Sequence, residues 1–269
     1  MDAAQLLFDS LMQKHLEQGE QMEKQELIEL ANSVYEETFW ATQYWAILKQ
    51  YAAIKGVYSE ELSYSPAFYN VVRIALYNAL IMLLAKLYDK DKRTVGIRYL
   101  LDSCLKNTPL FPQYDCELTV TAEDAQYLPE TAKYSYLRSR NSLQRASHEV
   151  NEKPVVVELT IVELFQYYQY KLSSISSLEN LRKQRNLYYA HLSKGYDFER
   201  VTRENPISAQ DIEQIISFSI EFCRTVIILL TGIVRAIEPV NIDDLENTLK
   251  MVQLGTDHQL NCQMKYAAE

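Results

Sequence analysis

Residues that break helices are scarce in this chain. Among 269 residues there are only six glycines and seven prolines, so turns must be few and the regular elements long. The Val-Thr alternation that marks strands is nearly absent, whereas Gln, Glu, Leu, Lys and Ala are plentiful. The composition therefore predicts an all-α protein that is long enough to bury a large core, in one or two domains.

Cysteine and positive charge are also in short supply. The four cysteines are scattered, with no CxxC pair and no histidine at metal-finger spacing (Cys104, Cys116, Cys223 and Cys262). This usage fits reduced thiols, so we expect a cytoplasmic location, no metal site and no cofactor. The formal net charge of −9 argues against a broadly basic nucleic-acid surface but leaves room for a local basic cleft.

Targeting and membrane segments are not predicted. Residues 1–18 lack both the basic start and the uninterrupted apolar core of a signal peptide. Two apolar segments, 71–88 and 215–234, resemble membrane spans, but each contains two charged residues. Both are therefore predicted to be core helices, and no membrane partner is expected.

Apolar residues recur at helical spacing along most of the chain. The predicted helices cover 25–54, 66–88, 95–106, a segment starting near 130, 155–171, about 174–194 and 209–237. Ser65-Pro66 and the box formed by Ser208 and Asp211 supply helix starts. Residues 107–129, with three prolines, are predicted to be irregular, and 66–88 is apolar enough to lie at the centre of a bundle.

The helices are predicted to form one bundle domain over residues 1–240. The helix at about 174–194 should end at Lys194-Gly195, the expected cation and left-handed residue of a helix C-terminus. Residues 241–269 are predicted to be a short helix and a frayed tail.

The stretch Arg185-Asn186-Leu187-Tyr188-Tyr189-Ala190-His191 offers chemistry that the rest of the chain does not. Arg185 falls on an apolar stripe, where a guanidinium is costly unless it is paired, stacked or open to water. Its planar fork can bind a phosphate bidentately. His191 lies in the predicted last turn, where helix carbonyls favour the imidazolium and keep its pKa suited to proton transfer. Together with Asn186, these residues could form a metal-free phosphodiester cleavage site.

The geometry of one straight helix does not bring these groups together. At ~100° and ~1.5 Å per residue, Arg185 and His191 lie about 120° apart and ~9 Å along the axis, with Asn186 farther round. They could converge where two copies of the helix meet across a twofold axis. A catalytic function therefore predicts a homodimer.

Basic and aromatic residues elsewhere could assist RNA binding. Cations gather on one predicted helix (Lys133, Arg138, Arg140, Arg145) and around the motif (Arg182, Lys183, Lys194). If the two helices pack together they would form a positive cleft, although a solvated face is the more common role of such clusters. Several of the twenty tyrosines, among them Tyr188, could stack on bases, or they could belong to the core.

The motif and its surroundings resemble the HEPN superfamily, and in particular its AbiU-type abortive-infection branch. The strings LRKQRNLYYAHLSKGYDF and ALYNALIMLLAKLYDKDKRTVGIRYLLDSC carry the resemblance, which extends over residues 25–238. It implies an antiparallel helical bundle with extra N-terminal helices, usually dimeric. It also implies a metal-independent endoribonuclease acting as a toxin or phage-defence component, with RNA as substrate and an antitoxin protein as a possible partner.

The resemblance also implies roles for individual residues. Arg185 would stabilise the scissile phosphate, Asn186 would orient it or the histidine, and His191 would be the general base on the ribose 2′-hydroxyl. The surrounding Arg182, Lys183, Tyr188 and Lys194 would bind substrate. One departure is Ser193, which stands where members silenced by a nucleotidyltransferase antitoxin carry tyrosine, so regulation by tyrosine AMPylation is not expected.

Two other functions remain open. The chain could be a non-catalytic HEPN-like module that binds a nucleotide or a protein partner. It could also be a structural bundle in which Arg185 is neutralised by a carboxylate such as Glu158, Glu163 or Glu221. His191 and Arg185 exposed in a cleft near their symmetry mates would favour catalysis, whereas Arg185 buried against a carboxylate would favour the structural bundle.

Overall fold

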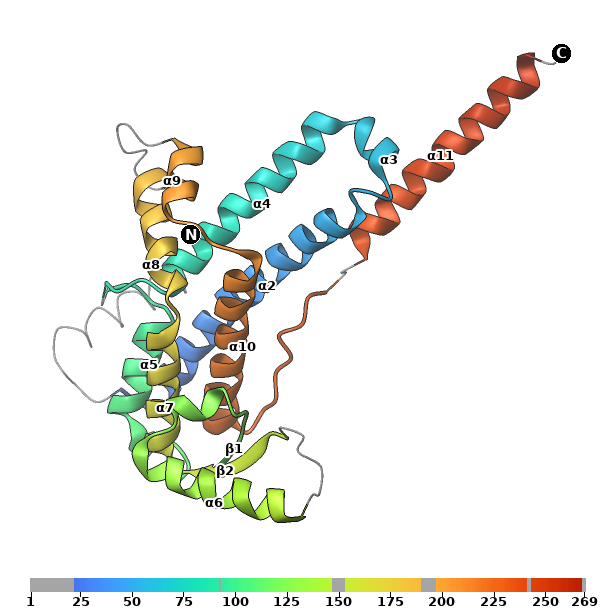
Figure 1. The fold of residues 1–269 in the computed structure, drawn as a ribbon. Helices are drawn as coiled ribbons and strands as arrows, with labels where there is room; N and C mark the ends of the chain where they lie inside the picture. The colour runs from blue at the N-terminus through green and yellow to red at the C-terminus, as the bar shows by residue number, and fades with distance from the viewer. Residues whose placement is uncertain (1–21, 92, 147–152, 190–196, 241–242, 268–269) are drawn as a thin grey trace.

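The computed structural model describes residues 22–91, 93–146, 153–189, 197–240 and 243–267, most of them helical (Figure 1). The all-α prediction is therefore confirmed. The first group of elements is α2 (Lys24–Ile54), α3 (Ser59–Ser63), α4 (Pro66–Leu87), α5 (Ile97–Lys106), η1 (Thr108–Leu110), β1 (Cys116–Val120), η2 (Asp124–Tyr127) and α6 (Glu130–Ala146). The second group is β2 (Val155–Leu159), α7 (Ile161–Ser174), α8 (Ser177–Gln184), η3 (Arg185–Tyr189), α9 (Phe198–Glu204), α10 (Ala209–Thr231) and α11 (Asp244–Ala267).

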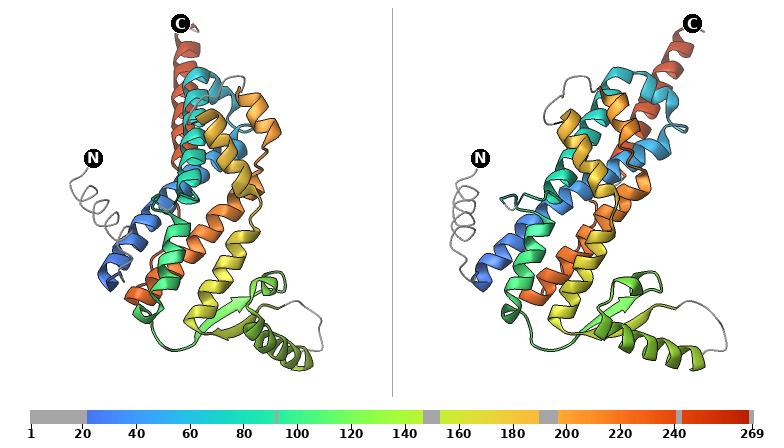
Figure 2. Two further views of the ribbon diagram at one scale, coloured as in Figure 1. Left: turned by 90° about the vertical axis from the view of Figure 1, so that its left-hand side faces the viewer. Right: turned by 60° about the vertical axis from the view of Figure 1, so that its left-hand side comes forward.

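The core lies where α2, α5, α7 and α10 pack side by side (Figure 2). Large aromatic side chains fill it: Tyr168 and Phe222 are fully buried, with ring centroids 5.2 Å apart in an edge-to-face arrangement. Tyr167 is buried as well, whereas Tyr170 is half exposed. Tyr167 and Tyr168 are thus core residues, because their rings supply the apolar area that a bundle of this size must bury.

A small two-stranded antiparallel sheet replaces part of the predicted helical pattern. β1 and β2 pair antiparallel, with Val120 opposite Val155 and Leu118 opposite Val157. The prediction that a helix begins at residue 155 is wrong, because three consecutive β-branched valines fit a strand better than a helix. The helix starts instead at Ile161, after Thr160, whose side chain and that of Glu163 form a reciprocal capping box.

The C-terminal helices also differ from their predicted bounds. The capping box of Ser208 and Asp211 forms as predicted. However, α10 ends at Thr231 rather than at residue 237, because Gly232 adopts a left-handed conformation (φ 70°) and its N–H donates to the Ile228 carbonyl at 2.7 Å. The predicted short helix after residue 241 is the long helix α11, 24 residues in length. It projects from the body beside α3 (Figure 1).

The predicted central position of α4 is correct for only part of that helix. Its C-terminal residues Leu80, Ile81 and Leu84 are fully buried. Its N-terminal half projects from the body, so that Phe68 and Val71 are 63% and 64% exposed. By length and composition, α4 and α10 could each cross a membrane. Half of the apolar stretch of α10 is buried inside the protein, whereas only 17% of the apolar stretch of α4 is buried. The core-helix prediction therefore holds for α10, and α4 presents an unpaired apolar face.

Candidate functional site

The segment that carries the motif is broken rather than continuous. The serine-rich segment 173–177, where the sequence allows either a kink or a break before the motif helix, is a break: α7 ends at Ser174, Ile175 adopts an extended conformation (ψ 91°), and α8 begins at Ser177. Hydroxyls of Ser173 and Ser174 donate back to the carbonyls of Gln169 and Lys171 at 2.8 and 2.7 Å. Such bonds compete with the helical hydrogen bonds and weaken the last turn.

The motif itself forms a π-helical turn. Residues Arg185–Tyr189 continue α8 with the wider i→i+5 hydrogen-bond pattern, which is rare and occurs often at functional sites. The wider turn changes the directions of the side chains of Asn186, Leu187 and Tyr188 from those in a straight α-helix. His191 and Lys194, together with Ser193 and Gly195, lie outside the described residues.

Arg185 is paired with a residue that the sequence did not single out. Its Nη1 donates to Oδ2 of Asp89 at 2.5 Å, and its Nε donates to Oδ1 of Asn186 at 3.0 Å. Asp89 lies in the turn after α4, 96 residues away along the chain. The first two residues of the motif therefore meet side by side, although the straight-helix argument placed them apart.

The pairing changes the electrostatics of Asp89. Partial burial by itself would raise the pKa of its carboxyl group. The hydrogen bond from Arg185 and those from the backbone N–H groups of Asp91 and Lys90 outweigh burial, so the pKa is lowered below its ordinary value. Asp89 is therefore an anion at neutral pH, and it balances the charge of Arg185.

The three glutamates proposed as partners of Arg185 do not pair with it. Glu221 pairs with Lys171 at 3.0 Å, Glu163 caps α7, and Glu158 is exposed on β2. With 20% of its side chain exposed, Arg185 is only partly buried, as expected for a guanidinium at a seam that reaches water. The buried apolar stripe predicted below it is confirmed by Leu178 and Leu181, which are 8% and 1% exposed.

An open pocket lies beside the motif, between α8, η3 and α9. It measures about 500 Å³, and its lining consists of Arg182, Lys183, Asn186, Leu187, Glu204 and Asn205. Three of the predicted site residues (Arg182, Lys183 and Asn186) are thus brought together around one space. Because this space is open to solvent and carries two cations against one carboxylate, it suits a phosphate group.

The two cations of this pocket are held differently. Arg182 donates to Glu179 at 2.7 Å, and Glu179 also pairs with Lys90 at 3.5 Å, which ties α8 to the turn that carries Asp89. Lys183 is exposed and makes no ion pair within the described part of the chain. Lys183 is therefore the cation most easily recruited by an incoming phosphate.

Tyr188, predicted to bind substrate, packs against α9. Its ring lies 5.5 Å from that of Phe198, tilted by 60°, and Tyr188 is half-buried while Phe198 is 41% exposed. The described geometry shows a ring pair at the edge of the motif, where an exposed aromatic face could receive a base. The side chain of Tyr189 lies outside the description.

A buried amide fixes the position of the motif. Gln184, immediately before Arg185, is fully buried, and its Nε2 donates to the Asn205 carbonyl at 2.7 Å. Asn180 reaches the Pro206 carbonyl in the same way at 2.9 Å. Local sequence patterns do not single out Gln184, Asp89 or Phe198, since each acts through a partner that is distant along the chain.

The two basic clusters do not form a joint cleft. α6, which carries Lys133, Arg138, Arg140 and Arg145, packs against β2 and lies at the opposite end of the molecule from α8 (Figures 1 and 2). The sheet that the sequence did not predict accounts for this separation, because it provides the apolar surface that α6 covers. The two helices do not pack together, so the shared positive cleft that depended on their contact does not form.

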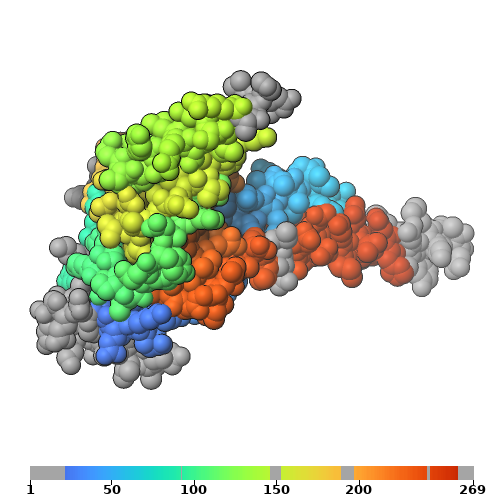
Figure 3. Space-filling model, turned by 90° about the horizontal axis from the view of Figure 1, so that it is seen from below, coloured from blue at the N-terminus to red at the C-terminus, as the bar shows by residue number. Residues whose placement is uncertain are grey.

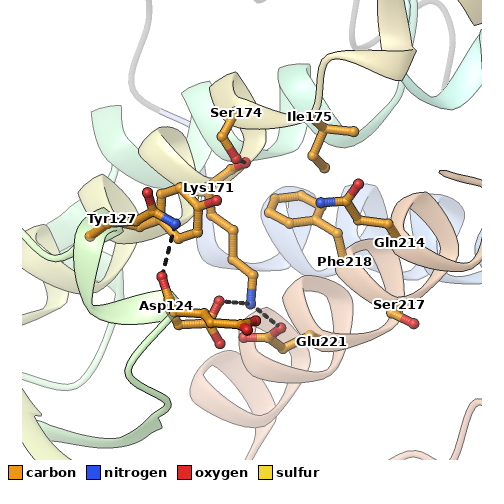
Figure 4. Close-up of a pocket in the computed structure, with 11 residues that line it drawn as sticks. Asp124, Tyr127, Lys171, Ser174, Ile175, Gln214, Ser217, Phe218 and Glu221 are labelled. Atoms are coloured by element: carbon orange, nitrogen blue, oxygen red, sulfur yellow. Dashed lines mark hydrogen bonds and ion pairs between the residues drawn. The ribbon is translucent and has the colours of Figure 1, made fainter. Parts of the chain in front are cut away.

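A second pocket, of about 420 Å³, lies between η2, α7 and α10 and is shown in Figure 4. Lys171 occupies its floor between Asp124 and Glu221, at 3.3 and 3.0 Å. Its Nζ also donates to the Tyr167 hydroxyl at 3.2 Å. Because the carboxylates already neutralise this cation, the cluster serves to hold three elements together rather than to bind a ligand.

The structure is thus a mostly helical body with an Arg-Asn pair on a π turn beside an open pocket. A family model described as AbiU2, within HEPN, matches residues 24–248, so the chain belongs to the AbiU2 family of HEPN proteins. No curated protein and no solved structure matches the chain. The resemblance seen in the sequence is confirmed, and membership relates the protein to abortive-infection functions of the HEPN type.

Proposed function

We propose that this protein is a metal-independent endoribonuclease of an abortive-infection system, with its site at the pocket beside Arg185. The observation that supports it best is that the Asn186 amide and the unpaired Lys183 line one open space, while the Arg185 guanidinium is hydrogen-bonded to that same amide. These are the groups needed to hold and polarise a phosphodiester without a metal ion.

Arg185 retains hydrogen-bonding capacity for a phosphate. A guanidinium has five N–H donors, of which Asp89 and Asn186 take one each in the described structure. The amide NH2 of Asn186 can donate as well, since its Oδ1 accepts from Arg185. A phosphate entering the pocket would therefore meet donors whose positions are already fixed by the π turn and by Gln184.

The proposed reaction is attack by the ribose 2′-oxygen on the adjacent phosphorus. His191, at a position outside the described residues, would accept the 2′-hydroxyl proton as general base. The bond from phosphorus to the 5′-oxygen breaks, and that oxygen takes a proton to leave as a 5′-hydroxyl. The other product is a 2′,3′-cyclic phosphate. Arg185 would stabilise the charge that develops on the phosphoryl oxygens.

Association of two copies is part of the proposal. The exposed N-terminal half of α4, including Phe68, Val71 and Ile74, forms an apolar face, and α4 contains no acidic residue. An apolar face can pack against its own copy, as a twofold contact requires. α4 also packs against α8 and η3, so a contact along α4 would bring the second copy close to the motif. In sedimentation experiments Phe68→Ser should favour the monomer, with Tyr170→Ser, another exposed ring, as control.

Cleavage of RNA in EDTA tests the proposed reaction. We expect wild type to cut single-stranded RNA to products with cyclic phosphate ends, and we expect His191→Ala and Arg185→Gln each to reduce the rate at least 100-fold. Lys49→Gln, an exposed surface change, should cut like wild type. If cutting requires a divalent metal, or if His191→Ala retains full activity, the proposed mechanism is wrong.

A non-catalytic module is the second candidate. The pairing of Arg185 with Asp89 favours it, because a neutralised guanidinium is a normal part of a stable binding surface. Under this alternative neither wild type nor His191→Ala would cut RNA, while a nucleotide or an antitoxin protein would bind at the pocket. Isothermal titration with nucleoside triphosphates, comparing wild type with Lys183→Gln, distinguishes the two functions.

A further inference from the structure

The outer face of α6 is a basic surface on an acidic protein. Between residues 131 and 145 the chain carries four cations and no acidic residue, whereas the whole chain has a formal charge of −9. Figure 3 shows α6, in yellow-green, running across the face of the molecule that is seen from below. The inner side of the helix packs on the sheet through Ala132 and Tyr136, which are 3% and 4% exposed.

The exposed residues of α6 fall into an ordered pattern. At ~100° per residue, Arg138 and Arg145 share one edge of the outer face, and Lys133 and Arg140 share the other. The two members of each row are seven positions apart, which is about 10 Å along the helix. Tyr134 lies between the rows and is 73% exposed. Leu137 lies between the rows as well.

The cations in this pattern are largely available to a ligand. Lys133 is paired with Glu130 at 2.7 Å. The guanidinium groups of Arg138, Arg140 and Arg145 make no ion pair within the described residues, and Arg138 and Arg145 are exposed. Three unpaired arginines next to an exposed tyrosine ring combine bidentate phosphate donors with a stacking platform.

We infer that the outer face of α6 is a binding surface for single-stranded RNA, separate from the pocket beside Arg185. The choice of RNA as the polyanion rests on the function proposed above, whereas the choice of a polyanion rests on the charges alone. A membrane surface fits less well, because a helix that lies in a bilayer interface needs a continuous apolar face and α6 offers only Tyr134 and Leu137 between its two basic rows. The surface would hold a long RNA while another part of the same strand reaches the pocket.

Binding of a strand that cannot be cut tests this inference. The probe is a fluorescein-labelled 2′-O-methyl RNA of about 16 nucleotides, which is long enough to fill a typical single-strand binding site. It lacks the attacking 2′-hydroxyl, so its fluorescence anisotropy reports binding whether or not the protein is a nuclease. The test variant is Arg138→Gln/Arg140→Gln/Arg145→Gln. The matched control is Lys24→Gln/Lys55→Gln/Lys106→Gln, which removes the same charge from exposed lysines elsewhere.

We expect the α6 variant to bind at least tenfold more weakly, with the slope of log affinity against log salt reduced by about 2, and the control to bind less than threefold more weakly. Tyr134→Ser should weaken binding by a smaller factor at all salt concentrations. Equal losses in variant and control, or no binding by wild type, would overturn the inference. So would phosphatidylserine vesicles that bind wild type but not the α6 variant, with RNA binding unchanged.

The inference and the proposed nuclease fail separately. If wild type does not cut unmodified RNA but the α6 variant loses binding, the RNA-binding surface is supported and the nuclease function is contradicted. If wild type cuts and the α6 variant binds and cuts as well as wild type, the nuclease function is supported and the RNA-binding surface is contradicted. Far-UV circular dichroism should show unchanged helix content, since glutamine and arginine have similar helix propensities.

Discussion

Lys171 and Arg185 are two cations of nearly equal burial that differ in what surrounds them. Their side chains are 19% and 20% exposed, and each pairs with carboxylates from other elements. The ammonium of Lys171 forms ion pairs with Asp124 and Glu221 and donates to the Tyr167 hydroxyl, so its charge is fully engaged by these groups. Arg185 uses two of its five donors and lies on a π turn beside an open pocket.

The titration behaviour of the Lys171 cluster agrees with a structural role. Burial by itself would lower the pKa of Lys171, but Glu221 and Tyr167 outweigh it, and the pKa is raised. Burial raises the pKa of Tyr167 to about 12, despite the opposing effect of Lys171. Lys171 therefore stays a cation and Tyr167 a neutral phenol at neutral pH. Donor capacity that remains unused beside an open space, rather than a buried charge, therefore separates a candidate site from a structural ion pair.

The backbone that holds Asp89 next to Arg185 provides the largest expected effect. A Cβ at Gly96 would lie 2.4 Å from the Leu87 carbonyl oxygen, so Gly96→Ala must force the turn containing Asp89 away from α4. We expect the free energy of unfolding to fall by about 3 kcal/mol in urea titrations. Gly56→Ala, with open space around the new methyl group, should leave stability unchanged or slightly raised. Equal behaviour of the two variants would show that the turn is not held at Gly96.

Removing the Lys171 cation should lower the stability of the protein and leave RNA cleavage unchanged. Lys171→Met leaves Asp124 and Glu221 without their shared partner, and we expect a loss of about 2 kcal/mol in the free energy of unfolding. Lys49→Met breaks an ion pair with Glu213 in which both side chains are about half exposed, so its cost should stay below about 0.5 kcal/mol. RNA cleavage per folded molecule should be unchanged in Lys171→Met. A loss of cleavage by folded Lys171→Met would contradict the assignment of a structural role to Lys171.

Replacing Asp89, the partner of Arg185, should have a small effect on stability and a measurable effect on RNA binding. Asp89→Asn keeps a hydrogen-bond acceptor but removes the charge that competes with phosphate for the guanidinium. We expect a stability loss of about 0.7 kcal/mol, together with about threefold tighter RNA binding from the freed cation. Weaker RNA binding in Asp89→Asn would indicate that the carboxylate positions Arg185 for its substrate rather than competing with it.

The pH dependence of the same pair is the smallest effect. The native pKa of Asp89 lies below its ordinary value of 3.8, so its ionised form stabilises the folded state above that pH. This stabilisation is lost as the pH falls below 3.8 through the lowered native pKa. The stability difference between wild type and Asp89→Asn should therefore be constant above about pH 5 and should shrink towards zero in more acidic urea titrations. A difference that grows on acidification would contradict the pairing.

The local features of the fold were predictable from the sequence. Composition and 3.6-residue periodicity predicted α2, α4, α5 and α10, and the box formed by Ser208 and Asp211 marked the start of α10 to the residue. The apolar stripe below Arg185 was predicted as well, and so was the HEPN resemblance carried by the motif. These features depend on residues three or four positions apart, whose relation is written in the order of the chain.

The tertiary structure alone decided which distant groups meet. The pairing of β1 with β2, the exposure of half of α4 and the separation of α6 from α8 all depend on which apolar surfaces cover one another. The candidate site shows the same division. The sequence identified Arg185 and Asn186, while the choice of Asp89 over Glu158, Glu163 or Glu221 was made by a turn 96 residues away that the close approach at Gly96 holds in place. Periodicity gives a helix its buried side, but only packing determines what lies against that side.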